Sequence, residues 1–173
     1  MLVLVGSNSS TSINKQLTLG VLKQLNVTYD YLDLKSLDIP MFSEDLEREI
    51  KSPDSINSIL EQINSANSIF FVTNEHNGSM SAFLKNILDW LSRVNRKFLE
   101  GKKVFVLSTS NGKRGGLGAN EMLQRLVKSF GCEIYEAVYF PSFSENFDIE
   151  SQKVKNNDLL SEIDQKLNKI LNY

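Results

Sequence analysis

The chain has 173 residues, a formal net charge of −2 and one cysteine, Cys132. This length suits a single α/β domain, residues 1–173, whose core can fold without disulfides, and the balanced charge gives no electrostatic reason to expect nucleic acid or an anionic membrane as partner. The lone cysteine excludes a disulfide framework within the chain and suits a reducing cytosol. No basic, apolar leader follows Met1, and no apolar run approaches the roughly 20 residues needed to span a bilayer. The sequence therefore predicts a soluble cytoplasmic protein.

The predicted elements alternate between strands and helices along the chain. Runs rich in Val, Ile, Phe and Tyr predict strands at 1–5, 28–33, 68–73, 103–109 and 133–139. Apolar residues at helical spacing predict helices within 13–25, 56–63, 80–94, 119–130 and 159–171. The segments 36–52 and 140–152 are predicted to be loops.

Two helix ends carry specific signals. Ser52-Pro53 predicts a helix start with proline at the first helical position, because the N–H that proline lacks would be unpaired there anyway. Gly131 follows the apolar stripe of 119–130 and is predicted to be its C-terminal cap.

The alternation predicts an α/β fold, namely a flavodoxin-like, doubly wound, five-stranded parallel sheet in the order 2-1-3-4-5 with helices on both faces. The apolar runs "MLVLV", "SIFFVT" and "KVFVLST" are typical of strands buried on both faces. In such sheets, ligands bind outside the carboxyl ends of the strands, at the switch point between the first and third strands.

The predicted helix at 80–94 is apolar on more than one side. Leu84, Ile87, Leu88 and Leu91 form one face, and Trp90 belongs to an extension of that face around the helix. A helix of this kind usually contacts other surfaces on both sides. Two interpretations stay open: one side forms a subunit interface, or the helix is deeply buried within a single chain.

Three polar loops follow the first, third and fourth predicted strands. They are "GSNSSTS" at 6–12 (the first loop), "TNEHNGS" at 73–79 (the second loop) and "STSNGKRGG" at 108–116 (the third loop). Because the carboxyl ends of parallel strands share one edge of the sheet, we expect these loops to converge.

The first loop contains five hydroxyl side chains and leads directly into a predicted helix. The unpaired N–H groups at a helix N-terminus, with the helix dipole behind them, bind an anion without a fixed cation. Hydroxyls such as those of Ser7, Ser9 and Ser12 complete the shell around a phosphate. A single serine that caps the helix is the simpler explanation, but a cap needs only one or two such residues. The run therefore favours a phosphate site.

Other phosphate and metal chemistries do not match. The Walker spacing is missing around Gly112-Lys113, and no G-x-G-x-x-G follows the first strand. A phosphatase of this general fold would need a cysteine in the first loop, whereas the cysteine lies at position 132. One histidine and one distant cysteine make a zinc site a poor interpretation. Asn77-Gly78 and Asn111-Gly112 tolerate left-handed backbone angles and could turn main-chain N–H groups toward a ligand.

Four motifs within roughly residues 1–140 carry a resemblance to a known family. Gly6, Ser7, Ser12 and Asn14 keep the register of its first loop, and "TNEHNGS", "LKNILDWLSR" at 84–93 and "SNGKRGG" at 110–116 follow in order. With these motifs the chain resembles the NADPH-dependent FMN reductase family, which includes quinone, azo-dye and chromate reductases with a flavodoxin-like fold.

The resemblance implies noncovalently bound FMN, with NADPH or NADH as co-substrate. The electron acceptor would be a quinone, an azo compound, a metal oxyanion or free flavin, and the assembly a homodimer or homotetramer. The flavin N5 would carry the chemistry, so neither a catalytic side chain nor a metal is expected. The implied cofactor-binding residues are Ser7, Ser9, Ser12, Ile13, Asn14, Asn74, Glu75, His76, Asn77, Gly78, Ser110, Asn111, Gly112 and Gly115.

Three residues depart from the family pattern: Ser9 stands in place of arginine, Asn74 in place of proline and His76 in place of tyrosine. Without the arginine, the choice between NADPH and NADH stays open, because a 2′-phosphate normally requires a cationic partner. Lys113 and Arg114 either replace it or are solvated loop charges. Two alternatives to a reductase also stay open: an FMN-binding electron carrier, and a non-catalytic relative that has lost its flavin affinity.

Overall fold

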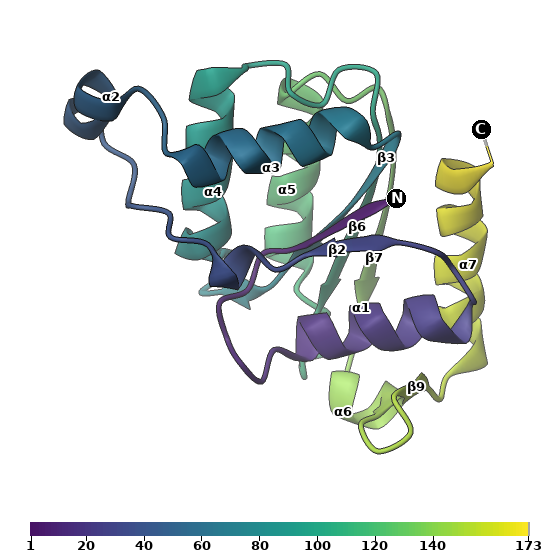
Figure 1. The fold of residues 1–173 in the computed structure, drawn as a ribbon. Coiled ribbons are helices and arrows are strands. Elements are labelled where there is room, and N and C mark those ends of the chain that lie inside the picture. Colours follow the sequence, from purple (N-terminus) through teal and green to yellow (C-terminus); the bar gives the residue numbers. More distant parts are fainter. Residues whose placement is uncertain (173) are drawn as a thin grey trace.

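The computed structural model describes residues 1–172, which form a parallel sheet between two layers of helices (Figure 1). The sheet has the order β2-β1-β3-β6-β7. Its strands are β1 (Leu2–Val5), β2 (Asp30–Leu32), β3 (Ser68–Thr73), β6 (Lys103–Thr109) and β7 (Ile134–Phe140). All neighbouring pairs are parallel. The predicted order 2-1-3-4-5 is therefore confirmed.

The helices cover both faces of the sheet, as predicted. One layer contains α3 (Asp54–Ser65), α4 (Ala82–Val94) and α5 (Leu117–Ser129), and the other contains α1 (Ile13–Gln24) and α7 (Asn157–Leu171). Successive strand residues point to opposite faces. Phe71 thus packs in the core under α4, while its neighbour Phe70 packs in the core under α1. The sheet is buried on both sides, which explains the continuous apolar runs.

Two segments predicted as loops contain regular structure. Within 36–52 lies α2 (Glu44–Ile50), which Ser43 caps by accepting the Leu46 N–H at 3.1 Å; the short helix η1 (Leu34–Ser36) precedes it. The helix α2 buries none of its residues, so it has no apolar stripe to reveal it. Figure 1 shows it standing off from the sheet, beyond α4.

The second such segment, 140–152, contains α6 (Phe143–Asn146) and β8 (Phe147–Asp148), which pairs with β9 (Lys153–Val154). The stacked rings of Phe143 and Phe147, 4.9 Å apart, hold this segment in the core under α1. Such a short helix and two-residue strands are below the length at which a periodic pattern can be read.

Of the two predicted helix ends, one is confirmed and the other is displaced by one residue. Gly131 directly follows the α5 cap residue Phe130 with a φ of +98°, which confirms it as the residue that ends the helix. Pro53 occupies the N-cap position and α3 starts at Asp54, so the predicted start is one residue early.

The chain itself covers the second apolar side of α4. Trp90 is fully buried, its ring meets that of Phe42 edge-on at 5.0 Å, and its Nε1 donates to the Pro40 carbonyl at 2.8 Å. Asn86 accepts the Phe42 N–H at 2.7 Å and donates to the Pro40 carbonyl at 3.0 Å. Burial within one chain therefore accounts for the composition of this helix, which no longer argues for a subunit interface.

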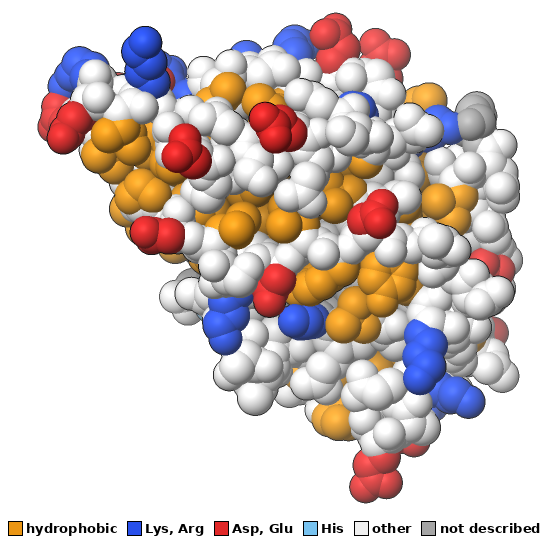
Figure 2. Space-filling model, viewed as in Figure 1, with side chains coloured by type: hydrophobic (Ala, Val, Ile, Leu, Met, Phe, Trp, Pro, Cys, Tyr) orange, Lys and Arg blue, Asp and Glu red, His pale blue; other side chains and the backbone are white. Residues whose placement is uncertain are grey.

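The face shown in Figure 2 carries lysine, arginine, aspartate and glutamate side chains that are mixed rather than segregated by sign, in keeping with the net charge of −2. In the described part of the chain, none of the helices combines the length and the apolar character required to cross a bilayer.

Candidate functional site

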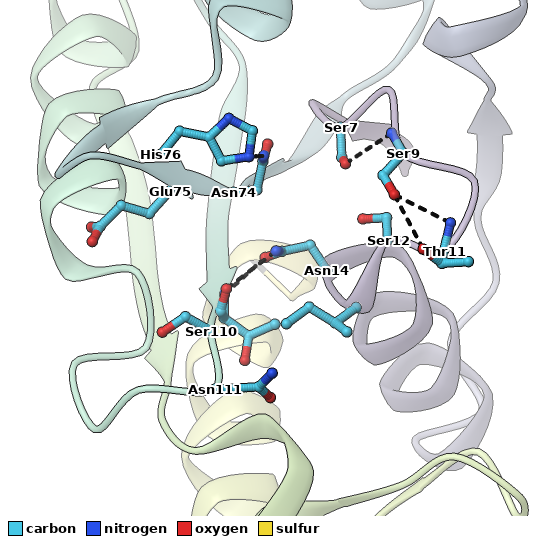
Figure 3. A pocket seen from close by; sticks show the side chains of 12 residues that line it. Ser7, Ser9, Thr11, Ser12, Asn14, Asn74, Glu75, His76, Ser110 and Asn111 are labelled. Atoms are coloured by element: carbon cyan, nitrogen blue, oxygen red, sulfur yellow. Dashed lines mark hydrogen bonds between the residues drawn. The ribbon is translucent and has the colours of Figure 1, made fainter.

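The three loops converge at the carboxyl edge of the sheet, as predicted, and enclose a cavity of about 250 Å³ (Figure 3). It lies at the switch point, where β1 and β3 are neighbours and the chain leaves β1 for α1. The cavity is lined by Ser7, Ser9, Thr11, Ser12, Ile13, Asn14, Asn74, Glu75, His76, Thr109, Ser110 and Asn111.

The first loop presents the N-terminus of α1 to this cavity. Ser12 is the N-cap residue, and its Oγ accepts the Lys15 N–H at 3.2 Å. Ser7 Oγ accepts the Ser9 N–H at 3.4 Å, and Ser9 Oγ accepts the Thr11 N–H at 3.3 Å. A helix leaves its first N–H groups without intrahelical partners, so this end of α1 provides donors and a positive dipole end for an anion. Capping uses the hydroxyl of Ser12, and those of Ser7, Ser9 and Thr11 line the same cavity.

Asn14 plays a structural part in addition to lining the cavity. Its side chain is buried, accepts the Thr109 N–H at 2.8 Å and donates to the Thr109 carbonyl at 3.2 Å. Both functions of the amide are therefore engaged with the end of β6. This pair of hydrogen bonds ties the first turn of α1 to the third loop.

The second loop is a small hairpin of β4 (Glu75–His76) and β5 (Ser79–Met80). Asn77 and Gly78 form its turn with φ values of +51° and +76°, which confirms the predicted left-handed conformation. The hairpin is fixed to α5, because Glu75 Oε2 accepts the Ala119 N–H at 3.0 Å. Asn77 and Gly78 themselves do not line the cavity.

The third loop differs from the prediction. Its left-handed residues are Gly115 and Gly116, with φ values of +56° and +77°, whereas Asn111 and Gly112 do not take positive φ values. Gly115 is also required by close packing, since a Cβ there would lie 2.7 Å from the Phe140 carbonyl. Left-handed glycines after Asn111-Gly112 thus make the turn into α5.

Most of the predicted cofactor-binding residues lie together, and four do not. Asn77, Gly78, Gly112 and Gly115 shape the second and third loops without lining the cavity. Two lining residues are absent from the predicted set, Thr11 and Thr109. Thr11 belongs to the hydroxyl-rich first loop from which the site was predicted. Thr109 is the last residue of a predicted buried strand, and no feature of the sequence indicates that it lines a site.

The cavity lining has no lysine or arginine, and its titratable residues are Glu75 and His76. Lys15, the nearest cation along the chain, faces β2 instead: its ammonium lies 4.9 Å from the centre of the Tyr31 ring, and its interaction with Tyr31 raises the pKa of Lys15. Within residues 1–172, no three His, Cys, Asp or Glu side chains are grouped so as to hold a metal ion.

The whole N-terminal part of the chain, residues 1–144, matches the family model described as NADPH-dependent FMN reductase. The chain belongs to this family. The match includes all three loops around the cavity, so membership confirms the predicted oxidoreductase class with FMN and a nicotinamide nucleotide as its cofactors.

Individual relatives agree with the family. A quinone reductase of Escherichia coli K12 is 31% identical over 128 residues, which cover 73% of this chain and 68% of that protein. An uncharacterised Mycoplasma pneumoniae protein is 29% identical over 154 residues, or 86% of this chain and 91% of that protein. The solved structure of FerB, a flavoenzyme NAD(P)H:(acceptor) oxidoreductase from Paracoccus denitrificans, has a TM-score of 0.75 at 23% identity, covering 99% of this chain and 96% of that one. This last likeness concerns the fold.

Proposed function

We propose that this protein is an NAD(P)H-dependent FMN reductase of the cytoplasm that passes electrons to a small-molecule acceptor such as a quinone or an azo compound, and that it works as a homodimer or homotetramer. The observation that carries the proposal is the neutral, hydroxyl-rich N-terminus of α1, which opens into the cavity at the switch point of the sheet. The quinone reductase among its relatives supports the acceptor class.

The residues present fit FMN. Ser7, Ser9 and Ser12 and the first N–H groups of α1 would hold the phosphate, because they offer donors and a dipole without a fixed cation. Asn74 Oδ1 is buried without a hydrogen-bond partner among the described residues. An unpaired buried oxygen is unfavourable, and a ring N–H or ribityl hydroxyl of the cofactor would satisfy it.

When bound, FMN would take up hydride from NAD(P)H and deliver electrons to the acceptor. The protein contributes orientation and hydrogen-bond donors for negative charge. In the third loop, the Gly112 N–H already bonds Ser110 Oγ at 3.3 Å, and the Gly115 N–H bonds the Gly112 carbonyl at 3.1 Å. Ser110 and Asn111 line the cavity, so their N–H groups are the proposed donors of this loop.

The neutral lining also bears on the nicotinamide nucleotide. With serine at position 9 and no cation lining the cavity, nothing there favours the extra 2′-phosphate of NADPH. We propose that NADH serves at least as well as NADPH.

The experiment is anaerobic reduction of the FMN-loaded protein by NADH and by NADPH, followed by steady-state oxidation with a quinone and with an azo dye. Bleaching of the flavin and turnover with an acceptor are expected. Flavin that binds but is not reduced would identify an electron carrier, and protein that binds no flavin would identify a non-catalytic relative. Light scattering after gel filtration measures the proposed oligomer.

A further inference from the structure

Asn74 and His76 form a hydrogen-bonded pair at the mouth of the cavity (Figure 3). We propose that His76 is a specificity-determining residue whose Nδ1–H donates to a carbonyl oxygen of the electron acceptor, and that Asn74 is the positioning residue that fixes this tautomer. The inference rests on the proposed function and names quinones, as neutral carbonyl acceptors, as the preferred acceptor class.

The hairpin that carries His76 is held firmly. The β4–β5 pairing places His76 opposite Ser79, and the left-handed turn closes the hairpin next to them. Glu75 binds the first turn of α5 through the Ala119 N–H, and a Cβ at Gly118 would lie 2.6 Å from the Gly78 carbonyl, so the hairpin rests directly on α5. The backbone of His76 therefore has a defined position although its side chain is exposed.

The contact within the pair determines where the imidazole proton lies. Asn74 Nδ2 and His76 Nε2 are 2.9 Å apart. In this orientation of the Asn74 amide, its nitrogen donates and Nε2 accepts, and a neutral imidazole that accepts at Nε2 carries its proton on Nδ1. His76 then has one N–H donor, at Nδ1, because Asn74 occupies Nε2.

Few side-chain N–H donors of the cavity are free for an acceptor molecule. The Asn14 amide is engaged with Thr109 and Asn74 Nδ2 with His76, while Asn111 Oδ1 accepts from Ser144 Oγ at 2.6 Å and leaves its Nδ2 as the other side-chain N–H donor of the lining. The lining contains no lysine or arginine, and Glu75, its other titratable residue, faces α5 through Ala119. A neutral N–H donor suits an uncharged carbonyl oxygen, whereas an anionic acceptor such as a metal oxyanion would call for a cation. Exposure of His76 keeps this donor within reach of a molecule that enters from solvent.

The tautomer can be read directly because the chain has one histidine. We would label the FMN-loaded protein with ¹⁵N-histidine and record long-range ¹H–¹⁵N correlations of the imidazole. A proton on Nδ1 is expected; a proton on Nε2 would overturn the inference. In Asn74→Asp, the carboxylate can only accept, so Nε2 should carry a proton whether the imidazole is neutral or cationic. An Nε2 without a proton in this variant would refute the positioning role of Asn74.

The kinetic test compares 1,4-benzoquinone with an uncharged azo dye, which takes electrons without offering a carbonyl. Loss of one neutral hydrogen bond should raise the KM for benzoquinone, relative to that for the azo dye, about 2- to 12-fold in His76→Phe. His76→Tyr, which keeps a ring and one donor, should recover most of this ratio. Lys113→Gln, on an exposed part of the third loop outside the lining, is the control and should leave the ratio unchanged.

The outcomes separate the two proposals. An unchanged ratio in His76→Phe, or equal changes with both acceptors, would overturn the role of His76 while the reductase activity stands. Failure of the unaltered protein to bind FMN or to oxidise NAD(P)H would overturn the proposed function, and the imidazole spectrum would still report the state of the pair. FMN dissociation constants, measured for every variant, separate a change in KM from a loss of cofactor.

Discussion

Replacement of Ser12 by aspartate separates the capping of α1 from the binding of a phosphate. Aspartate is as good an N-cap residue as serine, so it can take over the Lys15 N–H that Ser12 Oγ accepts at 3.2 Å. A carboxylate at a helix N-terminus also gains about 0.3–1 kcal/mol from the helix dipole. The free energy of unfolding of Ser12→Asp without cofactor should therefore equal or slightly exceed that of the unaltered protein.

The same carboxylate would repel a phosphate held at this helix end. Two unit charges about 4 Å apart interact by about 4 kcal/mol at the effective dielectric constant of a protein surface. That energy corresponds to a roughly thousandfold rise in the dissociation constant of FMN. The matched control, Ser12→Ala, removes the cap and one hydroxyl but adds no charge. It should lose about 1 kcal/mol of stability and bind FMN far better than Ser12→Asp.

The assay is quenching of FMN fluorescence on titration with apoprotein, together with thermal unfolding of each variant without cofactor. For a domain of this size, 1 kcal/mol corresponds to about 2–4 °C in Tm. If Ser12→Asp binds FMN as tightly as Ser12→Ala does, the phosphate does not lie at the N-terminus of α1 and the reasoning is refuted.

Three further predictions concern two residues that support the site, Asn14 and Gly118, and the thiol of Cys132, which lies where β6 and β7 begin. Asn14→Ala leaves the buried Thr109 N–H without its acceptor, which should cost about 2 kcal/mol and lower the Tm by about 4–8 °C; a thermal scan that shows no shift would contradict this. In Gly118→Ala the new Cβ would lie 2.6 Å from the Gly78 carbonyl, so the substitution should destabilise the protein and weaken FMN binding. In most helices, replacing glycine by alanine instead stabilises by about 1 kcal/mol. Denaturant unfolding measures the change in the free energy of unfolding, and an increase would contradict this prediction. Burial raises the pKa of Cys132 to about 11, so the folded protein should resist iodoacetamide at pH 8 and react once denatured. Because the thiol ionises in the unfolded chain near 9.0, stability should fall as the pH rises from 9 toward 11; a flat profile of stability against pH in this range would show that burial of the thiol has no such effect.

The sheet and the position of the site follow from local sequence patterns. Continuous apolar strands and amphipathic helices leave few ways to arrange five parallel strands, and the polar loops after three of these strands must then share one edge. The first loop could be interpreted by itself because its hydroxyls outnumber those that a helix cap requires.

The details that could not be predicted depend on contacts between distant residues. Nothing in the first loop indicates that Asn14 would engage Thr109 with both ends of its amide. The sequence Asn111-Gly112 is typical of a left-handed turn, yet the left-handed residues of the third loop are Gly115 and Gly116. Gly115 packs so closely against the Phe140 carbonyl that a side chain would not fit there, and the sequence does not reveal this contact. The apolar second side of α4 suggested a subunit interface because its true cover, the segment at Pro40 and Phe42, has no regular pattern.

Each loop at the site is fixed by a hydrogen bond to an element outside that loop. Ser81 Oγ donates to the Gly6 carbonyl of the first loop at 2.8 Å, Glu75 joins the hairpin to α5, and Thr109 Oγ1 donates to the Phe140 carbonyl at the end of β7 at 2.7 Å. These bonds are made within the chain and require no cofactor, so we expect FMN binding to spend little energy on ordering the loops. A phosphate site made only of neutral donors depends on fixed loops more than a site with lysine or arginine does. Hydroxyls and N–H groups bind a phosphate well only when several of them point at it together. In the proposed function, the order of the three loops would let the N-terminus of α1 hold a phosphate without a fixed positive charge.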